Sequence, residues 1–197
     1  MAFEKQFQIR DFEDKWLDSS LRELDKNAPR KQAILKYNKF LKNEPVEWIY
    51  LYGGTGSGRS LVAATMCVDA ASKNLGPICY LNCAKRVREL ADLSNDKKAA
   101  SDFQKLLDQY CNAKILVLDD FGNEFINDYI RDTIIYPIIS ARSNKGLLTI
   151  FTSDFTFDEI ETLYSTSKAG QIRAHQLVNS IKASAKKEID LSTPAIY

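Results

Sequence analysis

The sequence predicts an α/β fold in three layers, with helices on both faces of a mainly parallel sheet. Short apolar runs alternate along the chain with longer segments whose apolar residues recur at helical spacing. One of these runs, Ile115-Leu116-Val117-Leu118, is apolar without interruption, which is typical of a strand covered on both faces. A glycine-rich loop joins another run to a helical segment, and this order of strand, loop and helix is the third observation behind the prediction.

The expected strands lie at about residues 47–52, 78–81, 115–118, 147–152 and 188–191. Between them, helical patterns run from about 28 to 42, from the glycine loop to about 73, around 87–93, and over about 99–111, 128–142 and 169–183. Asn27 is placed to cap the first helix, and Pro137 should kink or split the helix at 128–142. Thr156 and Glu159 form a capping box that starts a further helix.

Residues 1–27 alternate charged and aromatic side chains without a regular period. We expect an irregular N-terminal arm that packs its aromatic side chains on the core, followed by the main domain at 28–197. The start of the chain is charged and no run is long enough to cross a membrane, so we expect a cytoplasmic protein with no membrane partner.

Charge and cysteine spacing restrict the function classes. The formal net charge of +1 over 197 residues gives no support for nucleic-acid binding driven by overall charge, although it allows a local basic patch. Cys67, Cys79, Cys83 and Cys111 form no C-x-x-C pair, and His175 is the one histidine. We therefore expect reduced, mostly buried thiols and no zinc site.

The glycine-rich loop matches the phosphate-binding P-loop motif G-x-x-x-x-G-K-[ST] at all fixed positions but one, because Arg59 stands where the motif has lysine. Backbone N–H groups in such a loop, with the N-terminus of the following helix, hold phosphates, and Ser60 can offer its hydroxyl to Mg²⁺. Arginine keeps the charge but replaces a compact ammonium with a planar fork. The residues expected to bind ATP are Gly53, Gly54, Thr55, Gly56, Ser57, Gly58, Arg59, Ser60 and Leu61.

Acidic residues follow two of the apolar runs. Asp119 and Asp120 come at the end of the 115–118 strand, where Asp119 can hold Mg²⁺ and Asp120 can orient or deprotonate the attacking water. Thr152, Ser153 and Asp154 lie at the C-terminal end of the 147–152 strand, and any of them can reach the water or the γ-phosphate, because ligands in open α/β sheets lie at this edge. We expect Arg59, Asp120 and Asp154 to take part in ATP hydrolysis.

The segments Asp119-Asp120-Phe121-Gly122-Asn123-Glu124, Arg131-Asp132 and Phe151-Thr152-Ser153-Asp154-Phe155 resemble the AAA+ domain of bacterial DnaI/DnaC-type helicase loaders. The resemblance runs from about residue 7 to 191. It implies a P-loop NTPase of the AAA+/ASCE type with a five-stranded sheet in the order 5-1-4-3-2. It also implies the replicative DNA helicase as partner, self-association through AAA+ interfaces, and binding of single-stranded DNA.

The chain departs from the family pattern at three positions. The family has lysine at Arg59, asparagine at Asp154 and a C-terminal helical arginine where this chain has Gln176. These departures imply slow or impaired hydrolysis, while nucleotide binding depends mainly on the loop backbone. The family's loaders also carry an N-terminal helicase-binding domain, so the chain is either a fragment or a shortened version.

Several alternatives stay open from sequence. The arginine that acts across subunits can be Arg131, Arg142 or Arg173, and the candidate DNA contacts are Lys85, Arg86, Arg88 and the stretch 182–187. Other functions that the motifs allow are a nucleotide-responsive interaction module without catalysis, a transposition-helper ATPase of the same family and, third, a P-loop kinase.

Overall fold

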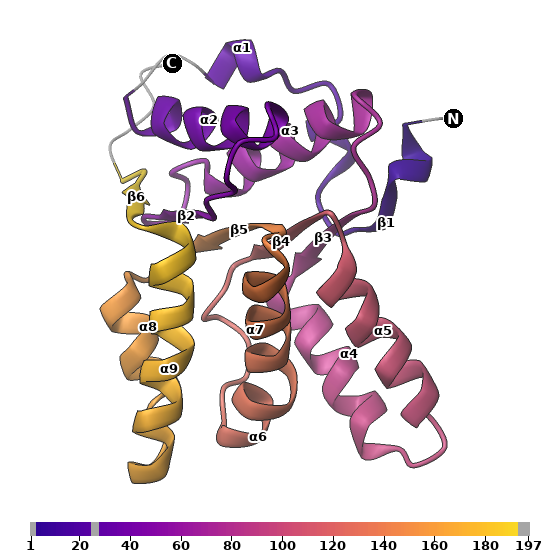
Figure 1. The fold of residues 1–197 in the computed structure, drawn as a ribbon, viewed down its shortest axis with the longest axis vertical. Helices are drawn as coiled ribbons and strands as arrows, with labels where there is room; N and C mark the ends of the chain where they lie inside the picture. Colours follow the sequence, from indigo (N-terminus) through magenta and orange to yellow (C-terminus); the bar gives the residue numbers. More distant parts are fainter. Residues whose placement is uncertain (1–2, 25–27, 193–197) are drawn as a thin grey trace.

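A six-stranded sheet with helices on both faces forms the protein, as seen in a computed structural model that describes residues 3–24 and 28–192 (Figure 1). Its strands follow the order β1-β3-β4-β5-β2-β6, and every described pair of neighbours is parallel. The three-layer α/β prediction is confirmed. The strands are β1 (Phe7–Arg10), β2 (Ile49–Tyr52), β3 (Ile78–Asn82), β4 (Ile115–Asp119), β5 (Leu148–Ser153) and β6 (Glu188–Asp190).

The predicted order of five strands is present as β6-β2-β5-β4-β3, and the correction is a sixth strand at the edge. β1 pairs with β3 through Phe7 opposite Ile78 and Arg10 opposite Tyr80, in the segment that we expected to be irregular. A segment of four residues is too short for its apolar and polar alternation to predict a strand. The partner that makes this segment a strand lies about seventy residues away in the sequence, so local patterning could not reveal it.

One face of the sheet is covered by α1 (Leu21–Leu24), α2 (Ala28–Leu41) and α3 (Arg59–Ser72), above the sheet in Figure 1. The expected cap of α2, Asn27, lies outside the described residues. The aromatic side chains of the N-terminal segment pack into this layer: the ring of Phe12 lies 5.0 Å from that of Tyr80 and 6.5 Å from that of Trp16. Two short 3₁₀ turns, Glu4–Gln6 and Asp14–Trp16, complete the segment.

The other face is covered by the helices from α4 to α9, below the sheet in Figure 1. The helix expected at 128–142 is divided into three parts, with a π-helical stretch Arg131–Ile135 in the middle, and Pro137 lies in the first turn of the last part. A wider turn before the proline accommodates a residue that has no N–H to donate. The helices of this layer are α4 (Cys83–Asn95), α5 (Ala100–Asn112), α6 (Asp128–Ile130), α7 (Tyr136–Lys145), α8 (Phe157–Tyr164) and α9 (Lys168–Ala185).

Two local predictions about this layer and the core are confirmed. The capping box forms at the start of α8, where the backbone N–H of Glu159 and the side chain of Thr156 bond as expected. All four cysteines are free thiols buried in the interior, and burial raises the pKa of Cys67 and Cys83. In the described residues, none of the helices is both long and apolar enough to traverse a bilayer.

Candidate nucleotide site

The glycine-rich loop connects the end of β2 to the start of α3, as the motif requires. Gly53 has φ of +146°, and a Cβ there would lie 3.0 Å from the backbone nitrogen of Ser192. Gly58 has φ of +85°, and its Cβ would lie 2.8 Å from a guanidinium nitrogen of Arg30. Both positions therefore require glycine, for conformation and for space. Arg59, Ser60 and Leu61 then form the first turn of α3.

Arg30, on α2, supports the loop from outside. Its Nη2 lies 3.5 Å from the carbonyl oxygen of Ser57, and the arginine is buried. The hydroxyl oxygen of Ser57 is buried and has no hydrogen-bond partner in the described part of the chain. A buried hydroxyl without a partner costs free energy, so this position favours a ligand with a polar oxygen.

Arg59 is paired with Asp154, although these residues are 95 positions apart in the sequence. Its Nη2 donates to Asp154 Oδ1 at 2.6 Å, and its side chain is 8% exposed. The second nitrogen, Nη1, is buried and has no partner among the described residues. Asp154 Oδ2 accepts from Asn123 Nδ2 at 2.9 Å. Burial acts to raise the pKa of Asp154, but the hydrogen bonds from Asn123 and Arg59 outweigh it and lower the pKa.

The two acids at the end of β4 differ in their surroundings. Asp119 is buried, and its Oδ1 accepts from the hydroxyl of Thr152 at 2.6 Å. Asp120 adopts a left-handed conformation with φ of +57°, and its backbone N–H donates to the same hydroxyl at 2.9 Å. Burial, and then the charges of Asp119 and Asp154, raise the pKa of Asp120, while Arg59 opposes the change. Thr152 therefore fixes the position of both acids.

Tyr80, on β3, brings the loop and the acids together. Its hydroxyl donates to the carbonyl oxygen of Ser60 at 3.2 Å. Its pKa is raised, first by burial and then by the carboxylate of Asp119 beside it. Ser60 and Asp119, which we expected to share a metal ion, therefore both lie next to one phenol group. Nothing in the sequence marked Tyr80, Asn123 or Arg30 as part of the site, except that Asn123 lies inside the acidic motif.

Of the three polar residues at the end of β5, two point inward, which corrects the expectation that any of them could reach the ligand. Thr152 and Ser153 are fully buried, and the hydroxyl of Ser153 donates to the carbonyl oxygen of Phe121 at 2.7 Å. Asp154 alone keeps a partly exposed side chain, at 34%.

The three arginines that we considered for action across subunits differ in their exposure. Arg131 is buried and bonds to Asp128, Asp132 and the carbonyl oxygen of Tyr164. Arg142 is fully buried and bonds to backbone carbonyls and to Thr149. Neither can reach a neighbouring molecule, so these two expectations are wrong. Arg173 is exposed on α9.

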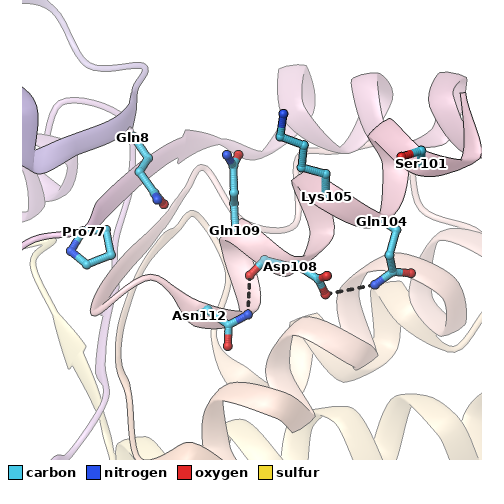
Figure 2. A pocket seen from close by; sticks show the side chains of 8 residues that line it. All are labelled: Gln8, Pro77, Ser101, Gln104, Lys105, Asp108, Gln109 and Asn112. Atoms are coloured by element: carbon cyan, nitrogen blue, oxygen red, sulfur yellow. Dashed lines mark hydrogen bonds between the residues drawn. The ribbon is translucent and has the colours of Figure 1, made fainter.

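A separate groove of about 670 Å³ lies between β1 and α5, and it shares no residue with the glycine loop (Figure 2). Its walls carry side-chain amides, and Gln104 Nε2 donates to Asp108 Oδ1 at 2.9 Å. The residues of the sequence motifs therefore lie away from this groove. The groove is lined by Gln8, Pro77, Ser101, Gln104, Lys105, Asp108, Gln109 and Asn112.

Solved structures with similar folds include DnaI, with a TM-score of 0.77 and 22% identity over 98% of both chains. AMPPCP-bound DnaA from Aquifex aeolicus has a TM-score of 0.69 and 15% identity, over 89% of this chain and 50% of the other. At these identities the similarity establishes the α/β fold alone.

The replicative helicase loader DnaI of Bacillus subtilis (strain 168) is 28% identical over 174 residues. The match covers 84% of this chain and 54% of the relative, so the chain spans about half of that protein's length. The family model for the IstB-like ATP binding protein matches residues 10–178, which is most of the chain and includes the glycine loop, both acids of β4 and Asp154. The chain belongs to the family of IstB-like ATP-binding proteins.

Proposed function

We propose that the protein binds ATP with Mg²⁺ and acts as a helicase loader in DNA replication, with slow ATP hydrolysis. The observation that carries the proposal is the meeting of the glycine loop, Arg59, Asp154 and the two acids of β4 at one edge of the sheet. In open α/β folds this edge holds the ligand. The loop from Gly53 to Leu61 would hold the phosphates through its N–H groups.

The residues present fit a nucleotide with its metal ion. The Ser57 hydroxyl and Arg59 Nη1 are buried polar groups without described partners, and a phosphate oxygen is an acceptor that suits both. Ser60 and Asp119, next to the same phenol, would hold Mg²⁺, which in such sites neutralises charge on the phosphates. Asp120, whose pKa is raised, would orient or deprotonate the attacking water, and Asp154 would act through Arg59.

Partner binding is proposed from the family. The DnaI relative is described as a replicative helicase loader, and we extend that role to this chain, with the replicative helicase as partner and the cytoplasm as location. Self-association through AAA+ interfaces is part of the proposal, and Arg173 is the one arginine of our three candidates that is exposed. Single-stranded DNA remains a proposed ligand, but Lys85 and Arg86 both bond to Asp11 and are less available for it.

The first experiment measures the melting temperature with millimolar ATP, with and without Mg²⁺. We expect ATP to raise the melting temperature, because a ligand that binds only the folded state stabilises it. Asp119→Ala should reduce the Mg²⁺-dependent part of the rise. Asp108→Ala, which changes an acid in the separate groove, is the matched control and should leave the rise unchanged. Absence of any ATP-dependent rise in the wild type would refute nucleotide binding.

The second experiment is a pull-down with the replicative helicase of the same organism, combined with a turnover assay. Capture of the helicase supports the loader, and its absence contradicts that role while leaving nucleotide binding intact. The turnover assay with helicase and DNA tests a second candidate, a nucleotide-responsive interaction module without significant catalysis. The pairing of Arg59 with Asp154 favours this second candidate, because it places a carboxylate beside the expected triphosphate.

A further inference from the structure

Arg59 and Asp154 are both unusual at their positions, and the structure joins them in one ion pair. Arg59 Nη2 donates to Asp154 Oδ1 at 2.6 Å. The carboxylate is held from its other side by Asn123 Nδ2 at 2.9 Å from Oδ2. The loop after β4, the end of β5 and the start of α3 are thereby connected through three side chains. The carboxylate cannot follow Arg59 freely, because Asn123 holds it in place.

The pair uses one half of the guanidinium fork. Arg59 Nη1 is buried and has no partner in the part of the chain that the structure describes. A guanidinium offers N–H groups on separate nitrogens, so it can bind a carboxylate with one and a phosphate with the other. A lysine ammonium is a single compact charge, and a carboxylate fixed beside it would compete with the phosphate for it.

We propose that Asp154 is a positioning residue that holds Arg59 with Nη1 directed to the phosphate, so that the arginine at the lysine position of the loop and the aspartate at 154 function only as a pair. The proposal rests on the proposed nucleotide site. Its consequence is that lysine, the residue that the ordinary motif has here, binds nucleotide worse than arginine as long as Asp154 is present.

The test is a double-mutant cycle on the affinity for ATP, read by isothermal calorimetry on the full chain with Mg²⁺. The four proteins are the wild type, Arg59→Lys, Asp154→Asn and the double variant. With Asp154 present, we expect Arg59→Lys to weaken ATP binding by about tenfold, because the lysine ammonium then pairs with the carboxylate of Asp154 instead of the phosphate. In the Asp154→Asn background, the same exchange should change the affinity by no more than about threefold, because no anion competes for the lysine.

Controls separate this proposal from the ones before it. Arg22→Lys changes an exposed arginine of α1 and should leave the affinity unchanged. Urea unfolding of all four proteins identifies any loss of fold, which would weaken binding in both halves of the cycle equally. If the wild type binds no ATP, the proposed function fails. The pairing is wrong if the wild type binds ATP and Arg59→Lys changes the affinity equally with and without Asp154. It is also wrong if Arg59→Lys binds ATP more tightly than the wild type. In both cases the proposed nucleotide site is unaffected.

Discussion

Arg142 and Arg59 are both buried arginines, but they are satisfied to very different extents. Arg142 lies between α7, β5 and the end of α5, and all three of its nitrogens donate hydrogen bonds. Its acceptors are the carbonyl oxygens of Tyr110, Ala113 and Leu148 and the hydroxyl of Thr149, at 2.5–2.9 Å. Arg59 has one described acceptor, Asp154, and leaves Nη1 without one.

This difference in hydrogen bonding indicates that Arg142 is a structural cation and that Arg59 is placed to bind a ligand. Arg142 connects the ends of neighbouring elements, because it donates to backbone carbonyl oxygens of Tyr110, Ala113 and Leu148. Burial lowers its pKa to about 9, so it is still charged at neutral pH. Arg59 donates to the carboxylate of Asp154 through Nη2 only, and its buried Nη1 has no described acceptor. It lies at the carboxyl end of the strands, where ligands bind in open α/β folds.

The largest effect expected from this comparison is that of Arg142→Met. The substitution keeps a long side chain but removes every donor, and it leaves three buried carbonyl oxygens without their partner. We expect the free energy of unfolding to fall by about 3–5 kcal/mol. Urea unfolding at neutral pH measures it.

Arg59→Met is the matched variant, because it makes the same change at the arginine that is only partly satisfied. Asp154 is partly exposed and can be hydrated once the arginine is gone, so the expected loss is about 1 kcal/mol or less. Equal losses in the two variants would contradict the distinction between a structural arginine and a ligand-directed one.

Asp11 offers an intermediate case, a buried anion at the sheet edge with a complete set of donors. It accepts from the backbone N–H of Asn82, from Lys85 Nζ at 3.0 Å, and from Arg86 Nε and Nη2 at 2.7 Å each. Asp11→Asn should lower the free energy of unfolding by about 1.5–3 kcal/mol at neutral pH, because the bonds to charged donors lose their anion.

The pH dependence of this effect has a definite sign. Burial acts to raise the pKa of Asp11, but the bonds from Arg86 and Lys85 outweigh it, so the pKa lies below the ordinary 3.8. A carboxyl with a lowered pKa contributes stability above 3.8 that is lost as the pH falls through the folded-state value. The wild type and Asp11→Asn should therefore converge in urea unfolding as the solution is acidified. If the free energies of unfolding of the two proteins still differ by the same amount below pH 3.8, the negative charge of Asp11 is not the source of its stabilising effect.

The fold could be predicted from sequence where the signal was local. The runs 115–118 and 147–152 and the glycine loop each carry their own pattern, and the order β6-β2-β5-β4-β3 is what the resemblance to the helicase loaders implies. β1 could not be predicted, because what makes Phe7–Arg10 a strand is its pairing with β3. The same holds for the π-helical stretch before Pro137: the proline indicated a disturbance, and its form depends on the packing around Ile134 and Ile135.

For the site, sequence identified which residue types were present but not how they face one another. Arg59 and Asp154 were each recognised as departures from a motif, and only their 2.6 Å contact shows that they are one feature. Thr152 and Ser153 were interpreted as ligand contacts because they follow a strand, yet they hold the backbone of the neighbouring turn. Arg131 and Arg142 carried no sequence sign of burial, since an arginine is usually exposed.

The last prediction concerns Glu124, a buried carboxyl that completes the comparison of buried charges. Its Oε2 accepts from the backbone N–H of Gly122 at 2.8 Å, and its Oε1 accepts from the hydroxyl of Tyr164. Burial raises its pKa above the ordinary 4.5, although these two bonds oppose the change. Unlike Asp11, it has no cationic partner among the described residues.

Because a raised pKa means that the folded state binds the proton more tightly, stability should fall as the pH rises from 4.5 through the folded-state value. A tenfold difference in proton affinity between the folded and unfolded states corresponds to about 1.4 kcal/mol. Glu124→Gln keeps the shape, and its amide can still accept from Gly122 while the tyrosine hydroxyl turns to accept from the amide nitrogen. The variant should therefore keep nearly the same stability at acid pH and lose this part of the pH dependence in urea unfolding. Parallel pH curves for the two proteins would mean that Glu124 binds its proton equally well in the folded and unfolded states, which would contradict a pKa raised by burial.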